Sequence, residues 1–179
     1  MTNLVIPAAT QVTLPIKGSN DLFPVRRIYC IGRNYAEHAI EMGFDPKDDP
    51  FFFQKNPNNV DLTGKFPYPP ESKDVHHEME MVFALKSGGS NIAEKDAYKH
   101  IFGFAIGLDM TRRDLQGISK KTGRPWEIGK AFERSAPMGP LTTIEECGNM
   151  DSGRITLKVN GEVRQDGDLN MMIWKIPMQ

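Results

Sequence analysis

Three acidic residues have the types and the spacing to bind a divalent cation. Glu78 and Glu80 are separated by one residue in a run of strand-forming residues, and Asp109 ends an apolar run. Because side chains alternate along a strand, Glu78 and Glu80 should point to one face, where their charges repel unless a cation lies between them. Three oxygen ligands without a cysteine suit Mg²⁺ first, and then Mn²⁺ or Ca²⁺. The neighbouring His76 and His77 keep Zn²⁺ as a less favoured alternative.

Each of these acids also has an ordinary structural explanation. Alternating glutamates commonly form the solvent-facing side of a half-buried strand. Asp109 could instead cap the helix that is predicted to follow it, which is a frequent role for aspartate. The spacing of the two glutamates does not separate these alternatives, and the presence of the third acid favours the cation site.

A second pair of residues could move a proton. His38 and Glu41 are three residues apart in a predicted helix of residues 35–42. Their side chains would share a face of that helix, so the carboxylate could hold and polarise the imidazole. A general base that takes a proton from water needs a histidine oriented in this way. A solvated pair on the helix surface is the alternative, and it is the commoner one for this spacing.

Four further polar residues could bind an anionic substrate. Lys55 follows three consecutive phenylalanines, Arg113 and Gln116 lie one helical turn apart, and Lys130 lies in a glycine-containing segment. Each of them alone is most simply explained as a surface residue. Beside a metal ion, they would form a site for a substrate with carboxylate and keto oxygens.

The elements that would position these residues are mainly short strands. Strands are predicted over residues 12–16, 25–31, 51–54, 77–85 and 102–110, and over 154–159 and 162–165. Helices are predicted over residues 35–42, 94–100, 112–121 and 169–174, and the proline-rich residues 56–72 form a predicted loop. Asn160-Gly161 between the last two strands is a strong signal for a tight hairpin. The sequence therefore predicts an α+β fold that is mainly β with short helices.

The composition restricts the class of protein. The chain has 179 residues, 39% of them hydrophobic, which is typical of one globular domain, here predicted to span residues 1–179. Its 22 Lys and Arg against 23 Asp and Glu give a net charge of −1, which does not favour a nucleic-acid partner. It has two cysteines and no long apolar run, so no disulfide framework and no membrane partner are predicted. A cytoplasmic location follows as the expectation.

Five segments together resemble the fumarylacetoacetate hydrolase family. They are IGRNYAEHAIE (31–41), FFFQK (51–55), HHEME (76–80), GLDMTRRDLQ (107–116) and GRPWEIGK (123–130). Their order along the chain is that of the family, and the first two are most similar to its acylpyruvate and fumarylpyruvate hydrolase branch. The resemblance implies the family's fold, a mixed β-roll or sandwich, and a homodimer.

The resemblance also implies roles for the candidate residues. Mg²⁺ would be held by Glu78, Glu80 and Asp109, and His38 with Glu41 would activate a water molecule. Lys130 would stabilise a developing enolate. The residues that would contact or enclose the substrate are Arg33, Tyr35, Lys55, Arg113 and Gln116.

The implied reaction is hydrolysis of a carbon–carbon bond in a small-molecule 3-acylpyruvate such as fumarylpyruvate, in the breakdown of aromatic compounds. Oxaloacetate decarboxylation, oxaloacetate tautomerisation or isomerisation of a 2-hydroxy-dienoate on the same residues are alternatives, because each passes through an enolate. The chain ends at Gln179, before the Pro-Gly-Asp turn and the Gly-Thr-Pro-x-Gly loop of the family. This predicts a C-terminally truncated domain, for which an inactive remnant is a further alternative.

Overall fold

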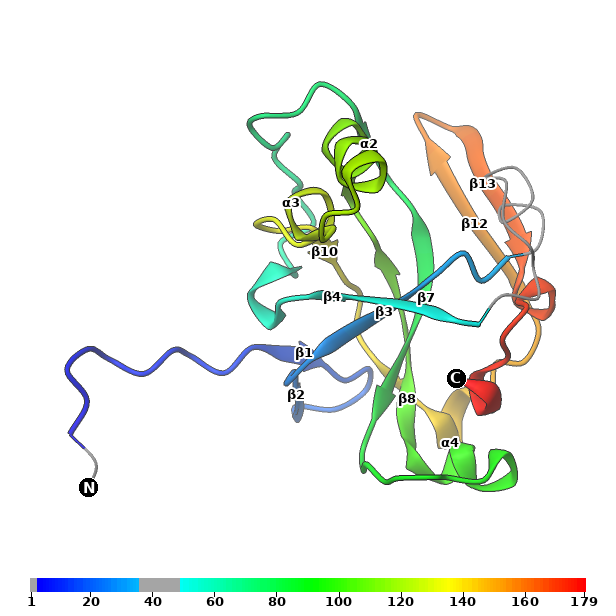
Figure 1. Ribbon diagram of the computed structural model, residues 1–179. Helices are drawn as coiled ribbons and strands as arrows, with labels where there is room; N and C mark the ends of the chain where they lie inside the picture. Colours follow the sequence, from blue (N-terminus) through cyan, green and yellow to red (C-terminus); the bar gives the residue numbers. More distant parts are fainter. Residues whose placement is uncertain (1–2, 36–48) are drawn as a thin grey trace.

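The computed structural model describes residues 3–35 and 49–179, and it is built mainly from short strands (Figure 1). The strands are β1 (Thr13–Pro15), β2 (Leu22–Pro24), β3 (Ile28–Gly32), β4 (Phe51–Lys55), β5 (Val60–Asp61), β6 (Val75–His76), β7 (Met79–Leu85), β8 (Ile101–Leu108), β9 (Thr111–Arg112), β10 (Ala136–Pro137), β11 (Thr142–Thr143), β12 (Arg154–Val159) and β13 (Glu162–Asp168). The helices are α2 (Arg113–Thr122), α3 (Glu127–Lys130) and α4 (Ile144–Cys147), with 3₁₀ turns at Pro57–Asn59, Glu94–His100, Leu169–Met171 and Ile176–Met178. The predicted mainly β fold with short helices is confirmed.

The antiparallel pair β7–β8 runs through the middle of the molecule, and β11 extends it on the other side of β8 (Figure 1). The register places Met79 opposite Leu108 and Glu80 opposite Gly107. Gln165 of β13 fastens the start of β7, because its side chain exchanges two hydrogen bonds with the backbone of Met79 at 2.7 and 2.8 Å. The segment that carries the two glutamates is therefore held from both sides.

Both faces of this strand pair are covered by apolar side chains. Val82 and Ala84 point to one face and pack with Leu14 and Leu141, whereas Phe83 points to the other face and packs near Ile176. A further cluster under the β12–β13 hairpin consists of Ile155, Leu169 and Met172. Because apolar residues line both faces, β7 and β8 are fixed in position at the centre of the domain.

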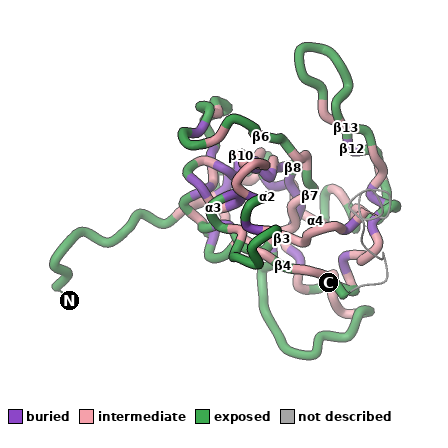
Figure 2. The backbone as a smooth tube through the Cα atoms, turned by 45° about the horizontal axis from the view of Figure 1, so that its top comes forward, coloured by how far each residue is buried: buried purple, intermediate pink, exposed green. Residues whose placement is uncertain are grey.

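The β12–β13 hairpin matches its sequence signal closely. Asn160 and Gly161 both have positive φ angles, 53° and 84°, which the tight turn between the strands requires. The far half of the hairpin is exposed and extends away from the rest of the molecule (Figure 2). Helix α2 also ends as predicted, because Gly123 caps it in the left-handed conformation at φ 65°.

The short helix predicted over residues 94–100 is present as a 3₁₀-helix. Three predicted elements differ from the structure. The helix predicted over residues 169–174 is a single 3₁₀ turn that ends at Met171. The loop of residues 56–72 contains β5, which pairs in parallel with β10. The strand predicted from residue 77 begins only at Met79, so Glu78 lies just before it. The predicted helix of residues 35–42 lies outside the described residues except for Tyr35. Among the helices of the described chain, none is long and apolar enough to cross a bilayer.

Replacing Leu141 by alanine tests this assignment of the core. Leu141 has no accessible surface and belongs to the cluster on the Ala84 face of the sheet. We expect Leu141→Ala to lower the free energy of unfolding in urea by about 2–5 kcal/mol, because the cavity adds to the lost burial. Leu85→Ala is the control, since Leu85 is 55% exposed, and should cost less than about 1 kcal/mol. Equal losses in the two variants would contradict the assignment.

Candidate active site

The strand register brings the acidic residues together. The backbone amide of Asp109 donates to the carbonyl of Glu78 at 2.8 Å, which continues the β7–β8 pairing one step beyond Met79 and Leu108. Glu78 and Asp109 are therefore opposite each other on neighbouring segments, and Glu80 lies two residues further along. Residues on opposite strands of such a pair have neighbouring side chains.

The ammonium group of Lys130 lies between two of these carboxylates. Lys130 ends α3 and is 3% exposed. Its Nζ donates to Glu78 Oε2 at 2.8 Å, to Asp109 Oδ2 at 2.7 Å and to Thr111 Oγ1 at 2.7 Å. An ammonium has three N–H donors, so all of its hydrogen-bonding capacity is used inside the protein. This satisfies the condition under which a lysine can be buried.

A second buried lysine approaches Asp109 from the other side. Lys55, at the end of β4, is 3% exposed, and its Nζ lies 2.9 Å from Asp109 Oδ1 as an ion pair. Nζ also donates to the carbonyl oxygens of Met110 and Lys130. Burial lowers the pKa of Lys55, while Asp109 opposes that change. Asp109 is thus held between two lysines.

Arg113 and Gln116 connect α2 to the same acids. Arg113 donates to Glu78 Oε1 at 2.5 Å and to Gln116 Oε1 at 2.7 Å, and Gln116 is 2% exposed. Helix α3 comes close to α2 at this point because residue 129 is glycine. A Cβ atom on Gly129 would lie 2.9–3.0 Å from Gln116 atoms, too close for any side chain. Gly129 thereby allows Lys130 to reach the carboxylates.

The two glutamates have opposite electrostatic environments. Burial opposes the ionisation of Glu78, but Lys130 and Arg113 outweigh it and lower the pKa of Glu78 to about 2. For Glu80, desolvation by the surrounding protein atoms and then the charges of Glu78 and Asp109 raise the pKa to about 8, although the residue is exposed by its accessible surface. Among the described residues, Glu80 has no hydrogen-bond or ion-pair partner. The Glu80 carboxylate therefore has no positively charged partner in this part of the chain.

The types of the acidic side chains suit a divalent cation, although their positions do not form a closed metal site. No group of three or more His, Cys, Asp or Glu side chains within residues 3–35 and 49–179 converges closely enough to hold a metal ion. Glu78 and Asp109 converge on the Lys130 ammonium, and Glu80 repels both of them. Carboxylate oxygens alone are the ligands that Mg²⁺ and Mn²⁺ prefer. A cation near Glu80 would offset both the desolvation of its carboxylate and the repulsion by Glu78 and Asp109, which together raise its pKa.

The other two predicted substrate residues lie in different surroundings, Arg33 beside two aromatic rings and Tyr35 against the apolar cluster under the hairpin. Arg33 follows β3 with φ 63°, and its guanidinium lies 5.4 Å from the centre of the Phe51 ring and 5.9 Å from that of Trp126. Tyr35 is half-buried, and its pKa is raised by burial and then by Glu80. The predicted dyad of His38 and Glu41 lies outside the described residues.

Two residues of the site were not predicted. Thr111 is fully buried and accepts a hydrogen bond from Lys130, and its signal in the sequence is only its place two residues after Asp109. Trp126 contacts Phe51 at 4.7 Å between ring centres. The cationic groups of Arg33 and Lys120 lie over the Trp126 ring. Trp126 belongs to the GRPWEIGK segment (123–130), but nothing in that segment's sequence indicated a role for the tryptophan.

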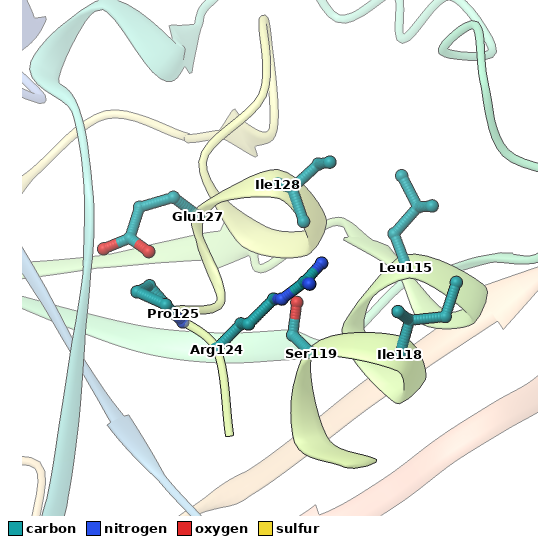
Figure 3. A pocket seen from close by; sticks show the side chains of 7 residues that line it. All are labelled: Leu115, Ile118, Ser119, Arg124, Pro125, Glu127 and Ile128. Atoms are coloured by element: carbon teal, nitrogen blue, oxygen red, sulfur yellow. The ribbon is translucent and has the colours of Figure 1, made fainter. Parts of the chain in front are cut away.

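A shallow apolar groove on the outside of α2 and α3 is separate from this cluster. Figure 3 shows Leu115 and Ile118 of α2 and Ile128 of α3 around it, with the Arg124 side chain extending into it. Leu115 and Ile118 are on the side of α2 opposite to Arg113 and Gln116, as helical periodicity requires. The groove contains none of the predicted site residues.

Comparisons with known proteins agree on one family. A family model described as fumarylacetoacetate (FAA) hydrolase C-terminal matches residues 27–179. The crystal structure of fumarylpyruvate hydrolase from Pseudomonas aeruginosa in complex with Mn²⁺ and pyruvate is 47% identical, with a TM-score of 0.95, over 98% of this chain and 78% of that chain. Oxaloacetate tautomerase of Escherichia coli is 38% identical over 86% of this chain and 71% of its own length. Mitochondrial oxaloacetate decarboxylase of Dictyostelium discoideum is 34% identical over 85% and 71%.

The pH dependence of stability tests the contacts of Glu78. Its pKa in the folded chain is about 2, below the ordinary value of 4.5, so the ionised carboxylate stabilises the fold above pH 4.5 and this contribution is lost as the pH falls toward 2. With EDTA present, Glu78→Gln should reduce the loss of unfolding free energy between pH 5 and pH 2 by on the order of 1–3 kcal/mol.

The matched control is Glu162→Gln, because Glu162 is exposed on the hairpin. Urea unfolding at several pH values gives the comparison. A pH dependence that is unchanged in Glu78→Gln would contradict the pairing of Glu78 with Lys130 and Arg113.

Proposed function

Because this chain belongs to the fumarylacetoacetate hydrolase family, we propose that it hydrolyses a carbon–carbon bond of 3-acylpyruvates such as fumarylpyruvate. The observation that carries the proposal is the 47% identity over 98% of the chain to a fumarylpyruvate hydrolase, against 34–38% over 85–86% for the oxaloacetate enzymes. The arrangement of charges described above supports it, because a dioxo acid needs a cation for its two keto oxygens and cationic donors for its carboxylate.

Glu78, Glu80 and Asp109 are the proposed ligands of a divalent cation, Mg²⁺ or Mn²⁺. The fumarylpyruvate hydrolase from Pseudomonas aeruginosa was crystallised with Mn²⁺. When bound, such a cation acts as a Lewis acid that polarises the keto oxygens of the substrate and stabilises negative charge on them. The unpaired Glu80 supports this role, because its carboxylate has no cation among the described residues.

The cationic residues bind and orient the substrate in this proposal. Arg113 and Gln116 are placed to bind its carboxylate, since the guanidinium presents paired N–H donors and Gln116 fixes its orientation. The positive charge of Lys130 stabilises the oxygen on which the enolate charge develops. Lys55 holds the Asp109 carboxylate in position through their ion pair.

His38 and Glu41 are the proposed base and its orienting carboxylate. His38 takes a proton from water, and the hydroxide adds to the carbonyl carbon of the acyl group. The bond between this carbon and the methylene group then breaks, and its electron pair remains with the pyruvate enolate. The proton held by His38 passes to the enolate carbon, so the products are pyruvate and the acid of the acyl group.

A second candidate is tautomerisation or decarboxylation of oxaloacetate. Two relatives, at 34% and 38% identity, carry the names oxaloacetate decarboxylase and oxaloacetate tautomerase. The same cationic residues would serve these reactions, because each forms the enolate of a 2-keto acid.

Turnover assays separate these candidates. Purified protein with Mg²⁺ or Mn²⁺ should hydrolyse fumarylpyruvate, followed by loss of its diketo absorbance, at least about tenfold more efficiently in kcat/KM than it acts on oxaloacetate. EDTA should abolish the activity. Faster action on oxaloacetate would favour the second candidate, and no turnover of either substrate would contradict both.

Metal titration tests the proposed ligands. Glu80→Gln should weaken Mn²⁺ binding at pH 7.5 by at least about tenfold, because a neutral amide replaces an anionic ligand. Calorimetry on the purified chain measures this without any substrate. The exposed Glu162→Gln variant should bind Mn²⁺ like the wild type. Unchanged affinity in Glu80→Gln would contradict its assignment as a ligand.

A further inference from the structure

The β12–β13 hairpin holds the residue that lies between the two glutamates of the site. Met79 separates Glu78 from Glu80, and its backbone is bound by the side chain of Gln165 in β13. Gln165 Oε1 accepts from the Met79 N–H at 2.7 Å, and Gln165 Nε2 donates to the Met79 carbonyl oxygen at 2.8 Å. The backbone of a residue on a neighbouring strand would make the same pair of bonds. The carboxamide therefore replaces a strand at this one position.

The direction of these bonds follows from the pairing of β7. This strand lies at the edge of its sheet, with β8 on one side only. The carbonyl oxygen of Glu78 accepts from the Asp109 amide on the β8 side at 2.8 Å. Backbone groups of successive residues in a strand point to opposite edges, so those of Met79 point away from β8. Gln165 meets them on that open side.

The hairpin has an irregularity directly beside this side chain. Leu157 of β12 lies opposite Gln165, whereas Lys158 lies opposite Val163, so Arg164 is an extra residue in β13. Such a bulge changes the direction of neighbouring side chains, and bulges are frequent beside active sites. Gln165 is half-buried, whereas Arg164 is exposed. The bulge thus accompanies the turn of Gln165 toward β7.

The side chain of Met79 is fixed by the same hairpin as its backbone. It packs against the apolar cluster under the hairpin. Strand alternation places the side chains of Glu78 and Glu80 on the opposite face from that of Met79. Because each glutamate shares a planar peptide group with Met79, a rotation of these peptide groups would move both carboxylates.

We propose that Gln165 is a positioning residue, which sets the relative placement of the Glu78 and Glu80 carboxylates through the backbone of Met79. The inference rests on the proposed function, in which both carboxylates bind the cation. Both side-chain hydrogen bonds of Gln165 go to the backbone, so it acts on the carboxylates indirectly. Residues that orient the ligands of a metal ion commonly change its affinity by about 10–100-fold.

Calorimetric titration of the purified chain with Mn²⁺ at pH 7.5 tests the inference. Gln165→Leu should weaken Mn²⁺ binding at least about fivefold, and the milder Gln165→Asn, whose amide is on a shorter side chain, at least about threefold. Leu141→Ala is the control for lost stability, since its cavity lies in a core cluster to which Met79 does not belong, and it should keep the wild-type affinity. Unchanged affinity in both Gln165 variants overturns the proposal, as does an equal loss in Leu141→Ala.

A double-mutant cycle without metal decides the inference if the wild type binds no Mn²⁺, an outcome that contradicts the proposed cation ligands. If Gln165 places Glu78 against Lys130 and Arg113, Glu78→Gln should destabilise the Gln165→Leu background less than the wild type. Urea unfolding with EDTA should show a coupling of at least about threefold in the unfolding equilibrium constant. Asp166→Asn, at the next position of β13, should be additive with Glu78→Gln. Additivity of Gln165→Leu with Glu78→Gln, or an equal coupling in Asp166→Asn, overturns the proposal.

Discussion

The burial of the Lys130 ammonium is the constraint on which the arrangement of the site depends. A buried charge is tolerated only when its hydrogen bonds and its countercharges are supplied by the protein. Here the acceptors come from three segments, since Glu78 precedes β7, Asp109 follows β8 and Thr111 lies in β9. Removing any one of them would leave an unsatisfied charge in the interior. The strand register, the course of the chain after β8 and the approach of α3 to α2 must therefore all be correct together.

Two of the three acidic residues near the Lys130 ammonium are paired with cations, whereas the third, Glu80, is not paired within the described chain. Lys55, Lys130 and Arg113 largely neutralise Glu78 and Asp109. The carboxylate of Glu80 remains without a hydrogen-bond or ion-pair partner among the described residues, and the charges of Glu78 and Asp109 repel it. A cation at this end of the site would offset that repulsion.

The sequence predicted elements with local signals and missed those that depend on distant contacts. The Asn160-Gly161 hairpin and the glycine end of α2 were predicted because a few adjacent residues determine them. The helix predicted from Leu169 was wrong, since Asp168 caps a single turn there and the chain then turns away. The pairing of β5 with β10 could not be predicted, because it joins residues more than 70 positions apart.

The candidate site was predicted as a set of residues but not as a geometry. Spacing indicated that Glu78 and Glu80 act together, yet only the β7–β8 register places Asp109 opposite Glu78. The contact of Lys130 with both acids depends on the packing of Gly129 against Gln116, which no local pattern encodes. Trp126 shows the same limit, because its ring brings Arg33 and Lys120 together from segments that are far apart in sequence.

Enzymes that form an enolate from a 2-keto acid need the same charges around the reacting atoms, whichever bond is broken. The cluster of Glu78, Asp109 and Lys130 is close to the proposed cation and to the developing oxyanion, so it suits hydrolysis, decarboxylation and tautomerisation equally. Discrimination between substrates must then come from groups that contact the remainder of the molecule. Residues outside the buried ion pairs can change without leaving a buried charge unpaired. One scaffold can therefore combine a constant reactive centre with a variable choice of substrate.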